Sequence, residues 1–301
     1  MKKCFIIILL IYSFNRAAFE NLFIDANTLG SGGAAVASRN ENCFIINPAN
    51  IKLHKTAYIS LSTYIANTML AATQEYGARL FSRFAINGNN ALAFAGEYTA
   101  FPYQGDYPGL NNILWDEIRA VLAYNYLLNK TFSCGISGTF CSYFSDFTLH
   151  NVKAKRTLSG DFSLGCKVTI QNYNIGLSFN NILQLNNGVC RFINLGFSSE
   201  KFDYNIEEYI IINGDISFNI DLSSVNLRLG TVFTFGKFFN FNAGLMINDM
   251  FKAGITPTAG ITFLLKKSRF SYAFSYNTRI GGYGNHYLNY GLLLDKKAKS
   301  K

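Results

Sequence analysis

Hydrophobic and polar residues alternate along most of the chain. From Phe239 to Ile247 every second residue is apolar, and Asn or Gly occupies most of the positions between them. The same period of two recurs in many other segments, including 162–170, 173–180, 227–235, 270–277 and 288–294. A period of two places alternate side chains on opposite faces of a β-strand. The pattern therefore predicts strands that are apolar on one face and polar on the other.

Between Tyr58 and Leu294 the alternation predicts about fourteen strands. Most of them are close to the 9–11 residues that a tilted strand needs to cross a bilayer. We place them near 58–66, 74–86, 91–99, 117–127, 131–142, 158–170, 173–182, 191–198, 206–220, 224–235, 238–248, 253–265, 269–277 and 285–294.

The connections between these strands form a second pattern, in which short and long segments tend to alternate. Short connections are expected at 87–90, 128–130, 171–172, 236–237 and 266–268, and longer ones at 67–73, 100–116, 143–157, 183–190 and 278–284. Three depart from the rule: 199–205 is too long, and those after the ninth and eleventh strands are short. Short turns on one rim and long loops on the other are typical of outer-membrane barrels.

The fold class that we predict is therefore all-β, a transmembrane antiparallel up-and-down β-barrel. Closure of the sheet leaves no strand edge with unpaired backbone groups in the hydrocarbon. The alternative is a water-soluble pair of sheets with the apolar faces inward, but so many long apolar faces exceed what a compact sandwich needs. Tyrosines near strand ends are expected to form interfacial girdles, namely Tyr64, Tyr98, Tyr126, Tyr143, Tyr173 and Tyr287.

The composition agrees with strands rather than membrane helices. Hydrophobic residues make up 49 % of the 301 residues and charged residues 15 %, yet the mean hydropathy is only +0.12. A bundle of membrane helices needs spans of about 20 nearly uninterrupted apolar residues, which would raise this value well above zero. The apolar content also argues against a disordered chain.

The two ends differ from the body of the chain. Met1–Ala18 resembles a secretory signal, with Lys2 and Lys3 before a short apolar core and cleavage expected after Ala18. We therefore expect a signal peptide at 1–18, an inward hatch at 19–57, a barrel at 58–294 and a basic tail at 295–301. The net charge of +9 lies mostly at the two ends, so no basic stripe suggests nucleic-acid binding.

Five cysteines follow the expected signal, without a CxxC motif or a metal-ligand spacing. They are Cys43, Cys134, Cys141, Cys166 and Cys190. The connection centred near position 150 predicts that Cys134 and Cys166 face each other on the apolar side of neighbouring strands. Two free apolar thiols are favoured over a disulfide, and thiol counting would decide between them.

A segment rich in small residues precedes the first strand and does not alternate. It contains Gly30, Gly32, Gly33, Ala34 and Ala37, and then Asn47-Pro48-Ala49 followed by Ile51. No Lys-Ser/Thr follows these glycines and no βαβ unit surrounds them, so a phosphate-binding loop is excluded.

This segment resembles the N-terminal signature of the FadL-like outer-membrane barrels, in particular the PorV/PorQ-like and related groups. Those proteins typically have an acidic pair and an Asn-Pro-Ala-Gly sequence, whereas this chain has Asn40-Glu41 and ends the motif with Asn50. The resemblance implies a segment that folds into the barrel as a hatch. By resemblance the hatch residues would be Gly30, Gly32, Gly33, Asn47, Pro48 and Ala49.

Strand parity predicts which charged residues face the lumen. The set comprises Arg79, Arg83, Glu97, Glu117, Arg119, Asp161, Lys167, Asp215 and Arg228. Mixed charges inside a barrel favour ion-pair networks that brace the wall over a substrate site. They do not form a ring of one sign, so selective ion permeation is not indicated.

These observations predict a bacterial outer-membrane protein that conducts hydrophobic small molecules. The alternative is a PorV-like accessory barrel of a type IX-like secretion pathway, with secretion proteins as partners. An enzyme is disfavoured because the three histidines, His54, His150 and His286, lack a nucleophile motif nearby. We expect outer-membrane lipids and a hydrophobic ligand as partners, and no cofactor, metal or nucleic acid.

Overall fold

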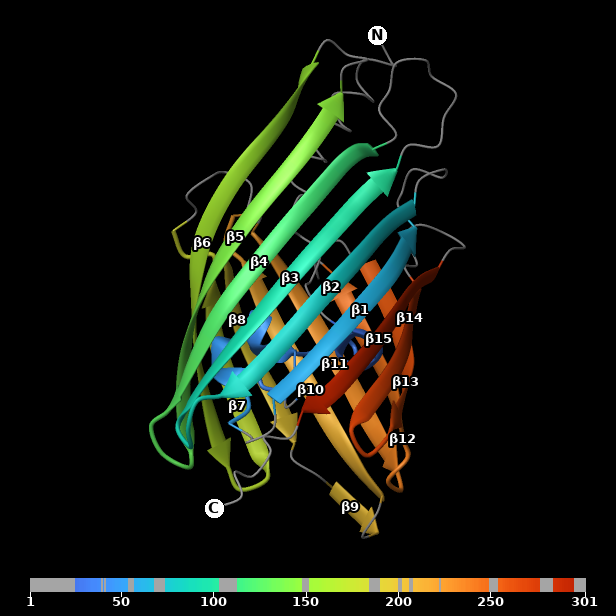
Figure 1. Ribbon diagram of the computed structural model, residues 1–301. Coiled ribbons are helices and arrows are strands. Elements are labelled where there is room, and N and C mark those ends of the chain that lie inside the picture. The colour runs from blue at the N-terminus through green and yellow to red at the C-terminus, as the bar shows by residue number, and fades with distance from the viewer. Residues whose placement is uncertain are drawn as a thin grey trace, which may run out of the picture.

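The chain forms one closed antiparallel β-barrel around a short helical segment (Figure 1). The structure is a computed structural model, and it describes residues 25–38, 40, 42–53, 57–67, 74–102, 113–147, 152–183, 190–199, 202–205, 208–221, 223–248, 254–276 and 284–294. Each long strand pairs with the next long strand in sequence, and the first strand pairs with the last from Ala57↔Leu294 to Ile65↔His286. This last pairing closes the barrel, which confirms the predicted fold class.

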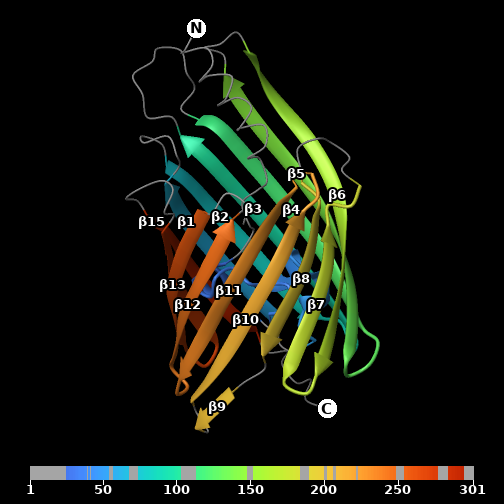
Figure 2. The same ribbon diagram turned by 180° about the vertical axis from the view of Figure 1, so that it is seen from behind.

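Fourteen long strands build the wall, and one short strand lies in a connection. The wall strands are β1 (Ala57–Asn67), β2 (Gln74–Ala85), β3 (Asn90–Pro102), β4 (Ile113–Leu127), β5 (Phe132–Phe147), β6 (Val152–Ile170), β7 (Tyr173–Asn180), β8 (Phe192–Ser199), β10 (Glu208–Asn219), β11 (Ser224–Phe235), β12 (Phe239–Asn248), β13 (Gly254–Leu264), β14 (Ser268–Tyr276) and β15 (Gly284–Leu294). The short strand β9 (Phe202–Asn205) pairs only with the start of β10. It lies in the connection 199–205, which was too long for the predicted pattern, and Figure 2 shows it beyond the lower end of the barrel wall.

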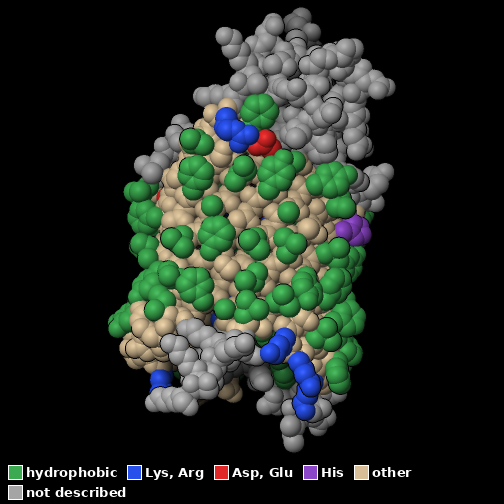
Figure 3. All heavy atoms as spheres, viewed as in Figure 1, with side chains coloured by type: hydrophobic (Ala, Val, Ile, Leu, Met, Phe, Trp, Pro, Cys, Tyr) green, Lys and Arg blue, Asp and Glu red, His purple; other side chains and the backbone are tan. Residues whose placement is uncertain are grey.

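The alternation sorts side chains between the outside and the lumen. On β1, Ile59, Leu61 and Ile65 are 40–52 % exposed, whereas Ser60 and Ser62 between them are 1 % exposed. Hydrophobic side chains cover the middle of the outer wall in Figure 3, and the visible charges lie towards its ends. An outer band of this kind matches the hydrocarbon core of a bilayer. Among the described residues, no helix is long and apolar enough to span a membrane.

Strands β4, β5 and β6 are longer than the sequence predicted and rise above the other strands (Figure 1). The predicted loop 143–157 is wrong, because β5 continues to Phe147 and β6 begins at Val152. The loop 100–116 is likewise shorter, since β4 begins at Ile113. The added residues include many polar ones, which hide the period of two. On this extension Arg156 pairs with Asp116, a pair that would be costly in hydrocarbon.

Three of the six tyrosines assigned to the interfacial girdles face the lumen instead, namely Tyr64, Tyr287 and Tyr143, which lies directly opposite the inward-facing Glu117. Tyr64 is 4 % exposed and stacks on Tyr287 with their ring centroids 5.4 Å apart. Parity explains the correction, because Ile65 and Leu288 beside them are the outward residues of β1 and β15. Tyr98, Tyr126 and Tyr173 do face outward, each 37–43 % exposed.

The predicted register between the fifth and sixth strands is confirmed. Cys134 on β5 lies directly opposite Cys166 on β6. Both belong to the outward parity of Ile136 and Leu164, and both are free thiols. The expected signal 1–18, the tail 295–301, His54 and His150 lie outside the described residues.

Candidate functional site

Residues 25–53, which we call the plug, cross the lumen in the half of the barrel nearer the short turns (Figure 1). The plug contains the helix α2 (Ala26–Gly30) and two 3₁₀ turns, η1 (Cys43–Ile45) and η2 (Pro48–Asn50). Helix α2 packs against β12–β15, whereas η1 and η2 pack on the side of β4–β6. The plug therefore touches opposite parts of the wall.

The Asn47-Pro48-Ala49 sequence forms the turn that joins the plug to β6. The Asn47 side chain caps η2 by accepting a hydrogen bond from the Ala49 N–H at 3.0 Å. Its amide nitrogen donates to the carbonyl oxygen of Val36 at 2.8 Å and to that of Cys166 on β6 at 3.1 Å. Pro48 follows at the first position of the turn, where its missing N–H costs nothing. One buried side chain thus connects the two parts of the plug to the wall.

The glycine-rich part of the plug docks on β11–β13. Asp25 caps α2 by accepting from the Thr28 N–H at 2.8 Å. Gly32 and Gly33 follow with φ values of +74° and +70°, a conformation that favours glycine. Thr258 on β13 holds this bend, because its hydroxyl accepts from the Gly32 N–H and donates to the Gly30 carbonyl.

Asp215 on β10 fixes the middle of the plug. Its Oδ2 atom accepts hydrogen bonds from the backbone N–H groups of Ala35 and Val36, the latter at 2.9 Å. Asn50 within the plug donates to the carbonyl oxygens of the same two residues. The cross-strand neighbour of Asp215 is Arg228, which is also buried and donates to Ser217. These contacts satisfy backbone groups that would otherwise be buried without partners.

Inward-facing glycines form a belt around the wall where the plug touches it. Six of these glycines form three cross-strand pairs on neighbouring strands. The belt consists of Gly135, Gly165, Gly176, Gly196, Gly230, Gly244 and Gly260. A Cβ atom on Gly176 would lie 2.3 Å from the Val36 carbonyl oxygen, and one on Gly230 would lie 1.9 Å from that of Ser31. Glycine in a strand interior commonly marks such a close approach of another backbone.

On the opposite side the plug and the wall together form a buried apolar cluster. Phe44, Ile45 and Ile51 pack against Phe81 and Val121 of the wall, together with the small residues Ala91, Ala93, Ala95 and Ala123. Burial also raises the pKa of the Cys43 thiol in η1 to about 12, with the nearby Asp25 carboxylate as a further cause.

A charged layer lies between this apolar cluster and the long-loop rim. Arg79 on β2 pairs with Glu97 on β3 at 2.5 Å, and Arg119 on β4 pairs with Glu117 at 2.9 Å. The Arg79 guanidinium also lies 4.2 Å from the ring centroid of Tyr64, whose hydroxyl contacts Glu75. Such a buried network rigidifies a wall when its members are satisfied.

Three further lumen-facing candidates lie on other parts of the wall. Arg83 approaches the carbonyl oxygen of Lys52 in the plug. Asp161 accepts from the backbone N–H groups of Phe162 and Leu183, in the plane of the wall. Lys167 is partly buried and shares the inward parity of Gly165.

Sequence reasoning missed the glycine belt and the lumen-facing Tyr64, Glu75 and Tyr287. The signal for the belt was present, because glycine recurs at polar-face positions of consecutive strands. The contribution of Tyr64 was hidden by its place near a strand end. His286 faces outward and is hydrogen bonded to Tyr272. Within the described residues, no group of acidic, His or Cys side chains could hold a metal ion.

No protein-family model and no curated protein matches the chain. Solved structures do match it, over nearly its whole length. The monoaromatic hydrocarbon channel CymD has a TM-score of 0.64 at 11 % identity, and covers 93 % of this chain and 100 % of its own. The toluene transporter TodX of Pseudomonas putida has a TM-score of 0.62 at 10 % identity, with coverages of 91 % and 99 %. A FadL homologue of Pseudomonas aeruginosa has a TM-score of 0.59 at 10 % identity, with coverages of 93 % and 100 %.

The fold is therefore that of the FadL-type channels. These neighbours are channels and transporters rather than enzymes. None of the three is named for a role in protein secretion, so they give no support to the alternative of a PorV-like accessory barrel.

Proposed function

We propose that this protein is an outer-membrane conduit for hydrophobic small molecules, with the plug as its hatch. The observation that carries the proposal is a closed, lipid-compatible barrel whose lumen holds its own N-terminal segment, fixed to the wall by Asp215 and Asn47. The same fold occurs in channels named for monoaromatic hydrocarbons and toluene.

The lumen holds a buried apolar cluster that would suit an apolar solute once the plug moves. Phe44 and Ile51 of the plug and Phe81 of the wall form a contiguous apolar cluster beside the charged layer. These three side chains are at most 1 % exposed, so a solute would reach them only when the plug moves, and the exchange of water for apolar surface would then favour hydrophobic molecules. The charged layer itself is proposed to brace the wall rather than to bind the solute.

Export would precede insertion. In the proposed pathway residues 1–18 act as a signal peptide that is cleaved after Ala18, and the remaining chain inserts into the outer membrane. Outer-membrane fractionation tests this placement, with gel mobility that changes on heating as the sign of a folded barrel. Extraction of the protein without detergent would contradict it.

Uptake of radiolabelled toluene tests transport. Cells of a Gram-negative host that produce the full chain should take up toluene faster than cells with an empty vector. Uptake of maltose, a polar solute of larger size, should be the same in both. Equal toluene uptake, in cells whose outer membrane contains the folded barrel, would overturn the proposed function.

A further inference from the structure

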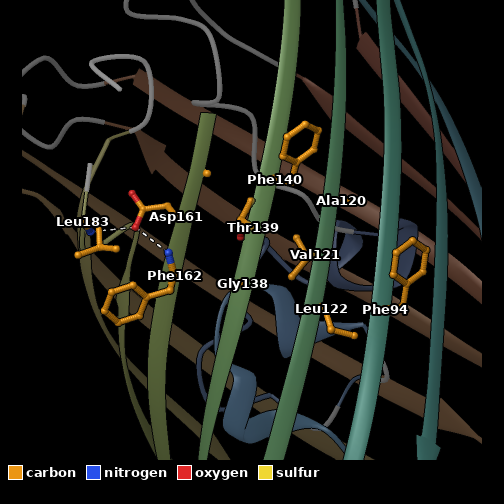
Figure 4. A pocket seen from close by; sticks show the side chains of 11 residues that line it. Phe94, Ala120, Val121, Leu122, Gly138, Thr139, Phe140, Asp161, Phe162 and Leu183 are labelled. Carbon is orange, nitrogen blue, oxygen red and sulfur yellow. Dashed lines mark hydrogen bonds between the residues drawn. The ribbon is translucent and has the colours of Figure 1, made fainter. Parts of the chain in front are cut away.

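A groove of about 420 Å³ runs along the outer face of β4, β5 and β6. Figure 4 shows it with the plug behind these strands, so it lies on the side away from the lumen. Its floor is made of the outward-facing small residues Ala120, Gly138 and Gly160. Larger apolar side chains flank it, namely Phe94, Leu122, Phe140, Phe162 and Leu183.

The cross-strand register explains the shape of this groove. Gly138 on β5 lies between Leu122 on β4 and Phe162 on β6. In the neighbouring row, Phe140 lies between Ala120 and Gly160. Large and small side chains therefore alternate across three strands, and the small ones leave a channel between the large ones.

Packing within the protein does not require these glycines. A Cβ atom on Gly138 would meet no atom within 4 Å, and the nearest atom to one on Gly160 would be 3.6 Å away. The inward Gly135 and Gly165 on the same strands are different, because a Cβ there would lie within 2.4 Å of the plug. Since glycine weakens a strand, an outward glycine that nothing inside the protein demands points to an external molecule.

A cation lies on the same outward face. Arg156 on β6 is four residues from Gly160, about 13 Å along the strand at the rise of a β-strand. Its side chain is 44 % exposed, and its guanidinium is held by Asp116 on β4 at 3.1 and 3.2 Å and by Ser142 on β5 at 3.0 Å. These bonds use some of the five N–H donors of the guanidinium and fix its position.

We propose that the groove binds one acyl chain of a lipid whose phosphate contacts Arg156. The groove is continuous with the apolar outer band, where Phe94, Leu122 and Phe140 are 39–60 % exposed. At that depth the surrounding molecules are lipids, and their acyl chains match the apolar walls. Guanidinium groups bind phosphate through directed N–H donors, which supplies the polar end of the site. This site is separate from the lumen and goes beyond the proposed transport function.

Native mass spectrometry of the full chain tests the site, after delipidation and titration with phosphatidylglycerol in detergent. The wild type should retain one lipid more tightly than a statistical distribution predicts. Ala120→Leu fills the floor and should weaken this binding about tenfold, equivalent to the burial of roughly two CH₂ groups. The matched control is Ala259→Leu, the same change on the exposed outer face of β13, and it should leave binding unchanged.

Two further variants distinguish binding of the acyl chain from binding of the lipid headgroup. Gly138→Leu is a second filling variant and should act like Ala120→Leu, because a Cβ atom there has no protein atom within 4 Å. Arg156→Gln should weaken phosphatidylglycerol but not diacylglycerol, which lacks the phosphate. Folding of every variant is checked by its heat-modifiable gel mobility.

Equal lipid retention by the wild type, Ala120→Leu and Gly138→Leu would overturn the proposal that the groove binds an acyl chain. Equal losses in Ala259→Leu would overturn it as well, because they would show a general effect of bulk on the outer wall. If Arg156→Gln weakens both lipids or neither, the assignment of the phosphate to Arg156 fails. Toluene uptake does not enter any of these outcomes, so failure of the groove and failure of the conduit are distinguishable.

Discussion

Asp215 on β10 accepts a hydrogen bond from the backbone N–H of Val36, at 2.9 Å, across the interface between wall and plug. The Val36 carbonyl oxygen also accepts hydrogen bonds from the side-chain amides of Asn47 and Asn50, so wall and plug contacts converge on one residue. This residue touches the glycine belt as well, at Gly176 and Gly196. A small set of buried hydrogen bonds therefore positions the plug where the glycine belt lets its backbone approach the wall.

The first prediction concerns this anchor. Asp215→Ala removes a charged acceptor from two buried N–H groups, which costs about 1.5–3 kcal/mol per bond to a charged group. We expect the plug to leave its seat more often, and the alkylation rate of buried Cys43 to rise about tenfold or more. Peptide mass spectrometry after timed alkylation measures that rate.

Asp221→Ala is the matched control for the anchor. Asp221 pairs with Arg191 near the long-loop rim and contacts no plug residue among those described. The Cys43 alkylation rate should stay at the wild-type value. A rise in both variants, or in neither, would argue against Asp215 as the anchor.

The second prediction concerns the glycine belt. Gly176→Ala places a methyl group 2.3 Å from the Val36 carbonyl oxygen, so plug and wall must separate. Overpacking of this kind typically costs about 1–3 kcal/mol. Urea unfolding of the detergent-solubilised barrel should show the loss. Gly138→Ala adds the same methyl group to open space on the outside and should change stability by less than about 0.5 kcal/mol. Equal losses of stability in the two variants would contradict close packing of the plug on the glycine belt.

The third prediction is a pH dependence at Cys43. Burial raises the pKa of this thiol from 9.0 to about 12, so the folded state holds its proton more tightly than the unfolded state. Its contribution to stability is fully present below about pH 9 and is lost as pH rises towards 12. Cys43→Ala should flatten the stability profile across that window. An unchanged profile, measured by urea unfolding at each pH, would exclude this thiol as the cause.

The fourth prediction compares two ion pairs. Glu97→Gln leaves Arg79 buried without its carboxylate, and breaking a buried pair typically costs about 3–5 kcal/mol. Arg191→Gln breaks a pair near the rim and should have almost no effect, since water replaces the partner. Thermal unfolding of both variants tests the contrast. A smaller loss for Glu97→Gln than for Arg191→Gln would contradict a bracing role of the charged layer.

The barrel was predictable from the sequence because period-two patterning and turn spacing are local. The same logic placed Cys134 opposite Cys166, since one turn centre fixes a whole register. The tops of β5 and β6 were missed because polar residues above a membrane need not alternate. The belt was missed for a different reason: a glycine such as Gly176 has meaning only once Val36, 140 positions away, is known to lie against it.

Conductance across a planar bilayer tests most directly the claim that the N-terminal segment closes the lumen. The wild-type chain and a variant lacking residues 25–53 are compared, after heat-modifiable mobility has shown that both barrels are folded. The wild type should pass little ionic current, and the deletion variant should give a steady open-pore current. Indistinguishable currents from the two barrels would contradict the plug, and with it the proposed hatch.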